Sequence, residues 1–216
     1  MKKVAVILSG CGVFDGAEIY ESVLTLLALA QAGAEVKVFA PNVEQLQVIN
    51  HLTGEAMAES RNVLVEASRI TRGEITDVAK LQASDFDALI VPGGFGAAKN
   101  LCDFAVSGAD CQIQADVLAA LRSFAEANKP VGYICIAPVM IPKVYGDGAS
   151  GTIGTDADTA AAFNAMGGQH QSCPVDEFRV DEARKIVSTP AYMLAGNILE
   201  AKSGIDKLVK EVLRLS

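Results

Sequence analysis

The sequence predicts an α/β protein, with a mainly parallel sheet and helices on both of its faces. Short apolar runs rich in β-branched residues alternate with segments of helical periodicity, which is the pattern of such a sheet. Residues 4–8 are apolar throughout, so we expect the first strand to be buried on both sides. Half of the 216 residues are hydrophobic, enough for a full core in a chain of this length. We expect a single domain over residues 1–216.

The next elements follow from periodicity and from the residues that end each segment. A helix is expected over residues 17–33, where apolar positions recur at helical spacing and Gly33 provides a stop. Residues 35–40 predict the second strand, which Pro41 ends.

An insertion interrupts the alternation after the second strand. Residues 42–80 contain a polar stretch and are predicted to lie over one end of the sheet. We expect a short helix at residues 43–49 and a second helical or irregular segment that runs to residue 70. Regular alternation resumes at residues 88–91, an apolar run that predicts a central strand.

The second half of the chain continues the pattern. A helix is expected at 110–128 and a strand at 130–134. Cys135 then leads into a helix with Pro138 near its first turn. Three further elements complete the fold: a helix at 156–166, a β-ribbon at 180–187 and a C-terminal helix at 195–213.

Composition limits the partners that the protein can have. The formal net charge is −8, and acidic and basic residues are scattered without a Lys/Arg cluster. Nucleic acid and anionic membranes both demand a basic face, so neither is expected as a partner. No apolar stretch approaches the roughly 20 residues that a membrane helix needs. The five cysteines are odd in number and lack C-x-x-C spacing, which predicts a reduced, cytoplasmic protein.

Three loops with unusual residues are predicted to meet at one edge of the sheet. They comprise residues 9–12, 92–96 and 135–138, each directly after a predicted strand. Ligands of an open parallel sheet bind outside the carboxyl ends of its strands. The convergence of three such loops therefore predicts the functional site at this edge.

Cys135 is the expected reactive centre. A side chain on a sharp turn between a buried strand and a helix projects from the sheet, beside the free N–H groups at the start of that helix. These groups stabilise a thiolate and lower the pKa of the thiol. The context resembles the nucleophile elbow of hydrolases, with sulfur in place of the hydroxyl. The alternative is an ordinary buried cysteine.

Backbone N–H groups and one carboxyl are the expected helpers of this thiol. The Gly93-Gly94 pair lets the backbone approach a ligand closely, and its N–H groups, with that of Ile136, could hold a developing oxyanion. Glu18 and Glu21 lie one turn apart on the first helix, which begins at the same edge. Burial and a nearby thiolate would raise the pKa of such a carboxyl, so that it stays protonated and shuttles protons. A tight turn and a solvated helix surface are the simpler alternatives.

Several segments resemble the PfpI/ThiJ superfamily of class I glutamine-amidotransferase-like proteins. The resemblance is closest to the ElbB branch, described as glyoxalase or isoprenoid-biosynthesis protein with an amidotransferase-like domain. The matching segments span nearly the whole chain: VILSGCGVFDGAEIYE from Val6, NHLTGEAM from Asn50, RNVL from Arg61, ITRGEI from Ile70, ALIVPGGFGAAKNL from Ala88, CIAP from Cys135, TIGTD from Thr152 and TPAYMLA from Thr189. The resemblance implies the flavodoxin-like, Rossmann-like three-layer sandwich of that superfamily.

The resemblance also implies the roles of two residues. It places the nucleophilic cysteine of the superfamily at Cys135. It places the partner glutamate at Glu21 rather than Glu18, counted back from the Ala32-Gly33 pair that ends the helix. These proteins pair as dimers, so a homodimer is expected.

The chain departs from the wider superfamily in its histidines. Many members carry one directly after the cysteine or at the loop occupied here by Thr155, whereas this chain has Ile136 after the cysteine and only two histidines. A Cys-His-Glu triad of the protease or glutaminase type is therefore not expected. His51, in the insertion, is the histidine that could lie near the site, and a surface position is its simpler interpretation. His170 is expected to be structural or exposed.

The activity that the resemblance implies is conversion of small α-oxoaldehydes, above all glyoxal, to glycolate by a glutathione-independent, glyoxalase-type lyase. Cys135 would add to the aldehyde to give a hemithioacetal, and Glu21 would move a proton between the two carbons. The N–H groups of Gly94 and Ile136 would hold the oxyanion. A thiol and one carboxyl cover every step, so no metal or other cofactor is expected.

Other functions stay open beside this one. A thiol-based sensor of oxidative stress, or a chaperone, would use the same Cys135, with Cys11 as a resolving thiol. An amidotransferase-like accessory protein of isoprenoid biosynthesis would deliver ammonia, which the missing histidine disfavours. A dinucleotide site is not expected, because the glycines of residues 10–16 are wrongly spaced. A structural zinc site is not expected either, since Cys102 and Cys111 lack a partner pair.

Overall fold

Apolar strands place the sheet in the middle of the molecule. The computed structural model describes residues 1–216, and β1 (Lys3–Ile7), β4 (Ala88–Val91) and β5 (Val131–Ile134) form its centre, almost entirely buried. β2 (Glu35–Ala40) and β9 (Ile186–Thr189) flank these three strands. All five strands run parallel, and β1 and β4 are the continuous apolar runs that predict such a sheet.

Short strands close the two edges of this sheet. The order of the seven strands is β3-β2-β1-β4-β5-β9-β8. β3 (Thr76–Asp77) pairs in parallel with the end of β2, and β8 (Arg179–Asp181) runs antiparallel to β9. β6 (Ser150–Gly151) and β7 (Gln169–His170) form a second, two-stranded sheet, and β6 lies against β8 and β9 of the first.

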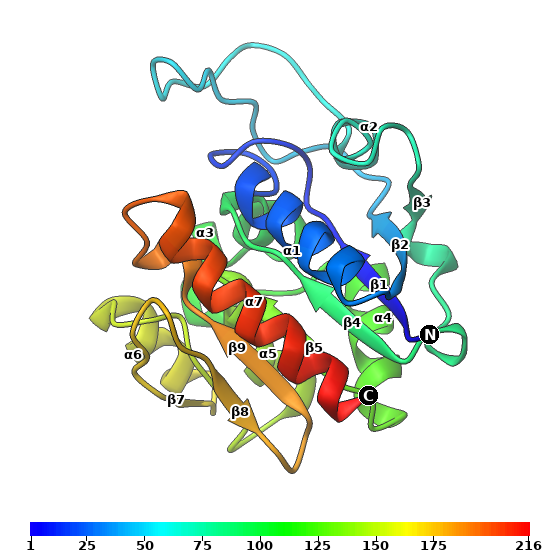
Figure 1. Ribbon diagram of the computed structural model, residues 1–216. Coiled ribbons are helices and arrows are strands. Elements are labelled where there is room, and N and C mark those ends of the chain that lie inside the picture. The colour runs from blue at the N-terminus through cyan, green and yellow to red at the C-terminus, as the bar shows by residue number, and fades with distance from the viewer.

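Helices cover both faces of the sheet because successive strand residues point to opposite sides (Figure 1). Val4 and Val6 belong to the core beneath α1 (Ile19–Gln31) and α7 (Ile198–Leu215). Ala5 and Ile7 belong to the opposite core, beneath α4 (Ala115–Glu126) and α5 (Ile141–Tyr145). The predicted α/β class, with helices on both faces, is confirmed. None of the helices combines the length and hydrophobicity needed to cross a membrane.

The helix predicted at residues 43–49 is wrong. Residues 42–62 form an irregular excursion over the end of the sheet, fastened by isolated bridges between Glu44 and Asn62 and between Ile49 and Ala56 (Figure 1). The N–H groups of Leu46 and Ile49 donate to side chains from other parts of the fold, and others donate to carbonyls within the segment, so it needs no helical ladder. α2 (Val63–Ala67) follows, with Asn62 as its N-cap.

Two helices begin later than the pattern predicts. α4 begins at Ala115 with Gln114 as its N-cap, and the preceding residues form α3 (Phe104–Ser107) inside a bridged loop. After Cys135 the chain makes a 3₁₀ turn at Ala137–Met140 before α5. Pro138 and Pro142 lack the N–H that a continuous ladder would use. α6 (Ala157–Ala165) begins as predicted, capped by Asp156.

Candidate active site

Cys135 occupies a strained turn directly after β5, at the carboxyl edge of the sheet. Its φ is 63°, in the left-handed region that side chains rarely adopt. Its N–H donates to the carbonyl of Thr189 at the end of β9 over 3.0 Å. The pairing of β5 with β9 therefore continues as far as Cys135 and fixes its backbone. Backbone strain of this kind is concentrated at functional sites. The predicted sharp turn is present.

Glu21 is the carboxyl that faces this cysteine. It lies in the first turn of α1 and is fully buried. Its Oε2 accepts the N–H of Gly93 over 2.9 Å, and its Oε1 accepts the N–H of Tyr192 over 3.1 Å. The carboxyl lies beside Cys135: Oε2 of Glu21 and the Cβ of Cys135 both approach Gly93, and the thiol acts on the pKa of the carboxyl. Burial raises the pKa of Glu21 to about 8, although the N–H groups of Tyr192 and Gly93 oppose the rise.

The Gly93-Gly94 pair allows this close approach. A Cβ on Gly93 would lie 2.4 Å from the Cβ of Cys135 and 2.8 Å from Oε2 of Glu21. Gly94 has a φ of +91°, and a Cβ there would meet the backbone nitrogen of Glu18 at 2.3 Å. Glycine is therefore required at both positions, because any side chain would push the loop away from Cys135 and Glu21.

Two backbone N–H groups point at the sulfur of Cys135. They belong to Gly94 and Ile136, and both lower the pKa of the thiol. Burial and the nearby Glu21 outweigh them, so the pKa of Cys135 is raised well above its ordinary value. The predicted lowering is therefore wrong in direction. The residue is only 8% exposed, and a short 3₁₀ turn follows it in place of a long helix.

The pair of Cys135 and Glu21 is best described as one titrating unit. Both groups are protonated at low pH because burial disfavours either charge. When the pair loses one proton, the remaining proton holds the two groups together in a monoanion. This monoanion places one negative charge and one proton between the sulfur and the carboxyl.

Glu18 supports the pair from the start of α1. It is the N-cap of the helix, and its Oε2 accepts the N–H of Glu21 over 2.6 Å. Its own N–H donates to the carbonyl of Gly93 over 3.0 Å. Of the two carboxyls considered in the sequence, the structure brings Glu21 to the sulfur and uses Glu18 as a cap.

Tyr192 is a site residue that the sequence did not reveal. It contributes only its backbone N–H to Glu21, and backbone donors leave no mark in residue chemistry. The preceding Ala191 has a φ of 43°, which turns the chain so that this N–H faces the carboxyl. The one available signal is that both residues lie in the TPAYMLA segment of the family resemblance.

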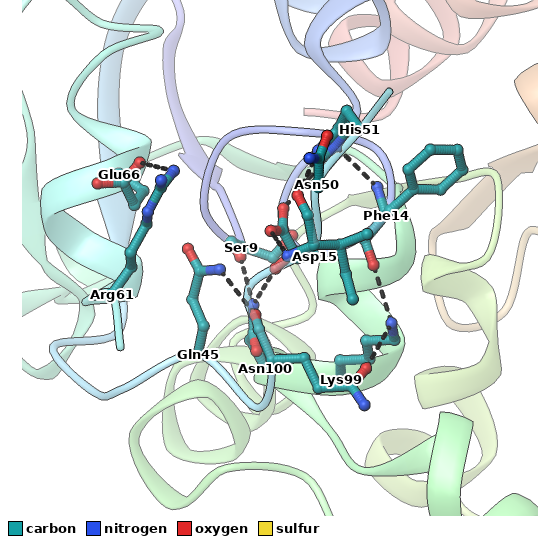
Figure 2. A network of polar contacts seen from close by, with 12 residues as sticks. Ser9, Phe14, Asp15, Gln45, Asn50, His51, Arg61, Glu66, Lys99 and Asn100 are labelled. Carbon is teal, nitrogen blue, oxygen red and sulfur yellow. Dashed lines mark hydrogen bonds and ion pairs between the residues drawn. The ribbon is translucent and has the colours of Figure 1, made fainter. Parts of the chain in front are cut away.

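His51 makes its contacts within residues 42–62 and with the loop after β1, not with the thiol of Cys135 (Figure 2). Its Nε2 accepts the N–H of Phe14 over 3.2 Å, and its Nδ1 lies 3.0 Å from the carbonyl of Ile49. The Nε2 atom also lies 3.9 Å from Oδ1 of Asp15. Neither ring nitrogen contacts Cys135, so these contacts form no Cys-His-Glu triad. His170 accepts the N–H of Ile153 over 3.2 Å and has the predicted structural role.

Asp15 and Asn100 fasten residues 42–62 to the loop after β1 (Figure 2). Asn100 is buried, and its Nδ2 donates to the carbonyls of Ser9 and Asp15 over 2.9 and 2.8 Å. Its Oδ1 accepts the N–H of Leu46 over 3.0 Å. Oδ2 of Asp15 accepts the N–H of Ile49 over 2.7 Å. The insertion is thus fixed to the same edge of the sheet that carries Cys135.

Fold and site together define a class: α/β proteins with a cysteine on a strained strand-to-helix turn and a buried glutamate facing it. The chain belongs to the DJ-1/PfpI family, which matches residues 2–152. The superfamily predicted from the sequence motifs is confirmed.

Relatives and solved structures agree with this assignment. The chain is 47% identical to the ES1 protein homolog, mitochondrial, of Rattus norvegicus, covering 99% of this chain and 84% of that protein. It is 46% identical to the human glutamine amidotransferase-like class 1 domain-containing protein 3, mitochondrial, covering 99% and 83%. A crystal structure of an isoprenoid biosynthesis protein with amidotransferase-like domain from Ehrlichia chaffeensis shares 35% identity and superposes with a TM-score of 0.93, covering 100% and 99%.

The cytoplasmic location expected from the sequence is wrong. The relatives from rat, human and zebrafish (Danio rerio) are all named as mitochondrial proteins. The expectation rested on five cysteines, which are all free in the structure. Free thiols indicate a reducing compartment without specifying which one.

Proposed function

We propose that the protein is a cofactor-independent glyoxalase that converts glyoxal, and other small α-oxoaldehydes, to the corresponding 2-hydroxy acids. The observation that carries the proposal is the contact between the Glu21 carboxyl and the Cys135 thiol. Both carboxyl oxygens are held by backbone N–H groups. The carboxyl is thereby fixed where it can exchange protons with the sulfur and with a carbon bound to it.

The first step forms a carbon–sulfur bond. The Cys135 sulfur adds to one aldehyde carbon of glyoxal, and the Glu21 carboxylate takes the thiol proton as the bond forms. The C=O π bond breaks, and its electron pair moves to the oxygen. The N–H groups of Gly94 and Ile136 already point at the sulfur, so they are near enough to hold that oxyanion. Glu21 returns the proton to the oxygen and leaves a hemithioacetal.

The second step moves hydrogen between the two carbons. Glu21, again a carboxylate, removes the proton from the carbon bound to sulfur, and an enediol forms as the second carbonyl oxygen takes a proton from water. Glu21 then delivers its proton to the second carbon, while the hydroxyl on the sulfur-bearing carbon gives its proton back to water, which leaves the thioester of glycolate. Water hydrolyses this thioester, releases glycolate and regenerates the Cys135 thiol. Overall, glyoxal and one water become glycolic acid, with no external oxidant or reductant.

The test is glycolate production from glyoxal by the purified protein without glutathione. We expect turnover by the wild type, none by Cys135→Ser, and a loss of about 10²–10⁴-fold in kcat for Glu21→Gln. Cys173→Ser is the matched control, since Cys173 is also buried and free but lies outside this site, and it should retain full activity. Equal rates for the wild type and Cys135→Ser would overturn the proposal.

One observation also favours a second function, as a sensor of oxidants. The N–H groups that surround the sulfur would donate to the oxygens of a sulfinic acid at Cys135, and a protonated Glu21 would add a third donor. A sensor would consume one or two equivalents of peroxide and show no steady-state turnover of glyoxal. A glyoxalase would turn over glyoxal many times and lose activity as Cys135 is oxidised.

A further inference from the structure

Three sulfur atoms gather in the core on the α4 and α5 side of the sheet, outside the site of Cys135. Sγ of Cys111 lies 3.8 Å from Sδ of Met166, which follows the last residue of α6. The thiol of Cys102 donates to the carbonyl of Ala97 over 3.3 Å and is near enough to Cys111 for each thiol to shift the pKa of the other. Met166 is 55 residues from Cys111 along the chain, so only the fold brings the third sulfur to the pair.

The register of the loop decides how the two thiols can be joined. Cys102 is bridged to Ile113 in an antiparallel pair, and Cys111 lies two residues before Ile113, on the same face. Diagonal neighbours in such a pair have Cα atoms about 7–8 Å apart. A disulfide spans at most about 6.8 Å between Cα atoms. A direct sulfur–sulfur bond would therefore require the backbone to move.

An ion placed between the sulfurs needs no such movement. Sulfur ligands that each lie about 2.3 Å from one metal ion are about 4 Å from each other. The 3.8 Å between Sγ of Cys111 and Sδ of Met166 matches this spacing. Cys111 and Met166 thus already have the spacing of two ligands of one ion, and the bridge between Cys102 and Ile113 brings the third sulfur to the same face of the loop.

We propose that Cys102, Cys111 and Met166 form a binding site for one Cu(I) ion. Two thiolates and one thioether are soft ligands, which favour Cu(I), zinc and iron–sulfur clusters over other biological metals, and iron–sulfur clusters need four cysteines. Zinc requires four nitrogen, sulfur or carboxylate ligands in a structural site. The molecule has no group of three or more His, Cys, Asp and Glu side chains placed for a metal, which excludes a complete zinc set around these sulfurs.

Charge and burial both suit a monovalent soft ion. On binding, the two thiols release two protons to solvent, so two thiolates and Cu(I) carry a net charge of −1. The positive charge of Lys143 acts on Cys111, so it lies where it can offset part of that net charge. Cys102 and Cys111 are buried, which keeps water from the ion, while the partly exposed Met166 can receive it.

The test is a Cu(I) titration of the reduced full-length protein under anaerobic conditions, against a chromogenic Cu(I) chelator. The background is Cys135→Ser, so that the reactive thiol does not compete. We expect one tightly bound Cu(I). Cys102→Ser and Cys111→Ser should each lower the Cu(I) affinity by at least about a hundredfold, because loss of a residue that only supports a ligand costs about 10- to 100-fold. Met166→Leu, which conserves volume, should weaken binding by a smaller factor.

Cys173→Ser and Cys11→Ser are the matched controls and should bind Cu(I) as the parent does. Circular dichroism of each variant separates lost ligands from lost folding, and Met166→Leu keeps the test valid if a cysteine variant fails to fold. Equal affinity in the parent and Met166→Leu, or an equal loss in Cys173→Ser, would overturn the site. A Cys102–Cys111 disulfide that forms under air and leaves no Cu(I) affinity on reduction would overturn it as well.

Discussion

The Glu21 carboxyl and the Cys135 thiol lie side by side in a place where neither is solvated. Each group makes it harder for the other to carry a charge, and burial adds to the effect. A thiolate formed by a helix dipole alone would be ready to react at neutral pH. Here the reactive monoanion forms only when the pair loses its first proton, and that condition makes reactivity depend on pH.

The rate of Cys135 alkylation, and kcat/KM for glyoxal, should both rise with pH through about 8, the value to which burial raises the pKa of Glu21. Below this value the pair is neutral and the sulfur keeps its proton. The measurement is iodoacetamide labelling of the peptide that contains Cys135, followed by mass spectrometry. Glu21→Gln should lose the inflection near 8, whereas Glu35→Gln, on the exposed start of β2, should keep it. A rate that is flat between about pH 6 and pH 9 would contradict the monoanion.

The same carboxyl should make the wild type less stable as pH rises. The pKa of Glu21 is raised from an ordinary value near 4.5 to about 8, so between these values the folded chain holds a proton that the unfolded chain has lost. The stabilisation is complete below the lower value and is lost by the upper one. The free energy of unfolding should fall by up to about 1.4 kcal/mol per pH unit in this window.

Urea unfolding of the wild type and of Glu21→Gln at several pH values checks this slope. Glutamine cannot accept both the Gly93 and the Tyr192 N–H groups, so the variant starts with a deficit that is independent of pH. The deficit should shrink as pH rises from about 5 to about 8. A deficit that is constant across this window would mean that the carboxyl ionises as freely in the folded chain as in the unfolded one.

Gly93→Ala should damage the site without unfolding the protein. The new methyl group would lie 2.4 Å from the Cβ of Cys135 and 2.8 Å from Oε2 of Glu21, so the loop and the carboxyl must separate. We expect a loss of about 1–3 kcal/mol of stability, a turnover below a tenth of the wild-type value and a weaker inflection near 8. In the control, Gly196→Ala, the added Cβ would be 3.7 Å from its nearest neighbour. Full activity in Gly93→Ala would show that the contact is not needed.

The strands and the nucleophile could be predicted because their signals are local. The strands predicted at 35–40 and 88–91 coincide with β2 and β4 residue for residue. The apolar strand before Cys135 and the proline-containing segment after it predict that this residue is the reactive centre. Glu21 was chosen over Glu18 only through the family motif, since both lie in the same stretch of helix and differ only in which way their carboxyls point.

The features that escaped prediction all depend on distant parts of the chain. The helix expected at 43–49 does not form because Asp15 and Asn100 accept backbone N–H groups of this segment. No local sequence pattern reveals these distant partners. The pKa of Cys135 was expected to fall because burial could not be judged from a strand-to-helix turn. The third sulfur beside Cys102 and Cys111 comes from a helix far along the chain.

Asn100→Ala should loosen the insertion while leaving the sheet in place. It removes the partners of two backbone carbonyls and of the Leu46 N–H, at a cost of about 3 kcal/mol. Proteolysis under native conditions should then cut within residues 42–62. Asn197→Ala, which removes the N-cap of α7, should cost about 1 kcal/mol without new cleavage there. An insertion that resists protease as well in Asn100→Ala as in the wild type would mean that other contacts fasten it.

Glu18→Gln separates the electrostatic role of Glu18 from its capping role. The Glu18 charge raises the pKa of Glu21, after burial and in opposition to the Tyr192 N–H. Removing that charge should shift the inflection of the alkylation rate to lower pH, and thereby increase the rate at neutral pH. Glutamine still offers an oxygen to the N–H of Glu21, so the cost in stability should stay below about 1 kcal/mol. If Glu18→Gln lowers stability without moving the inflection, Glu18 acts only as a cap. The pKa of Glu21 would then depend on burial and on its contact with Cys135 alone. If the inflection moves to lower pH while stability is nearly unchanged, the charge of Glu18 raises the pKa at which the Cys135–Glu21 pair loses its first proton.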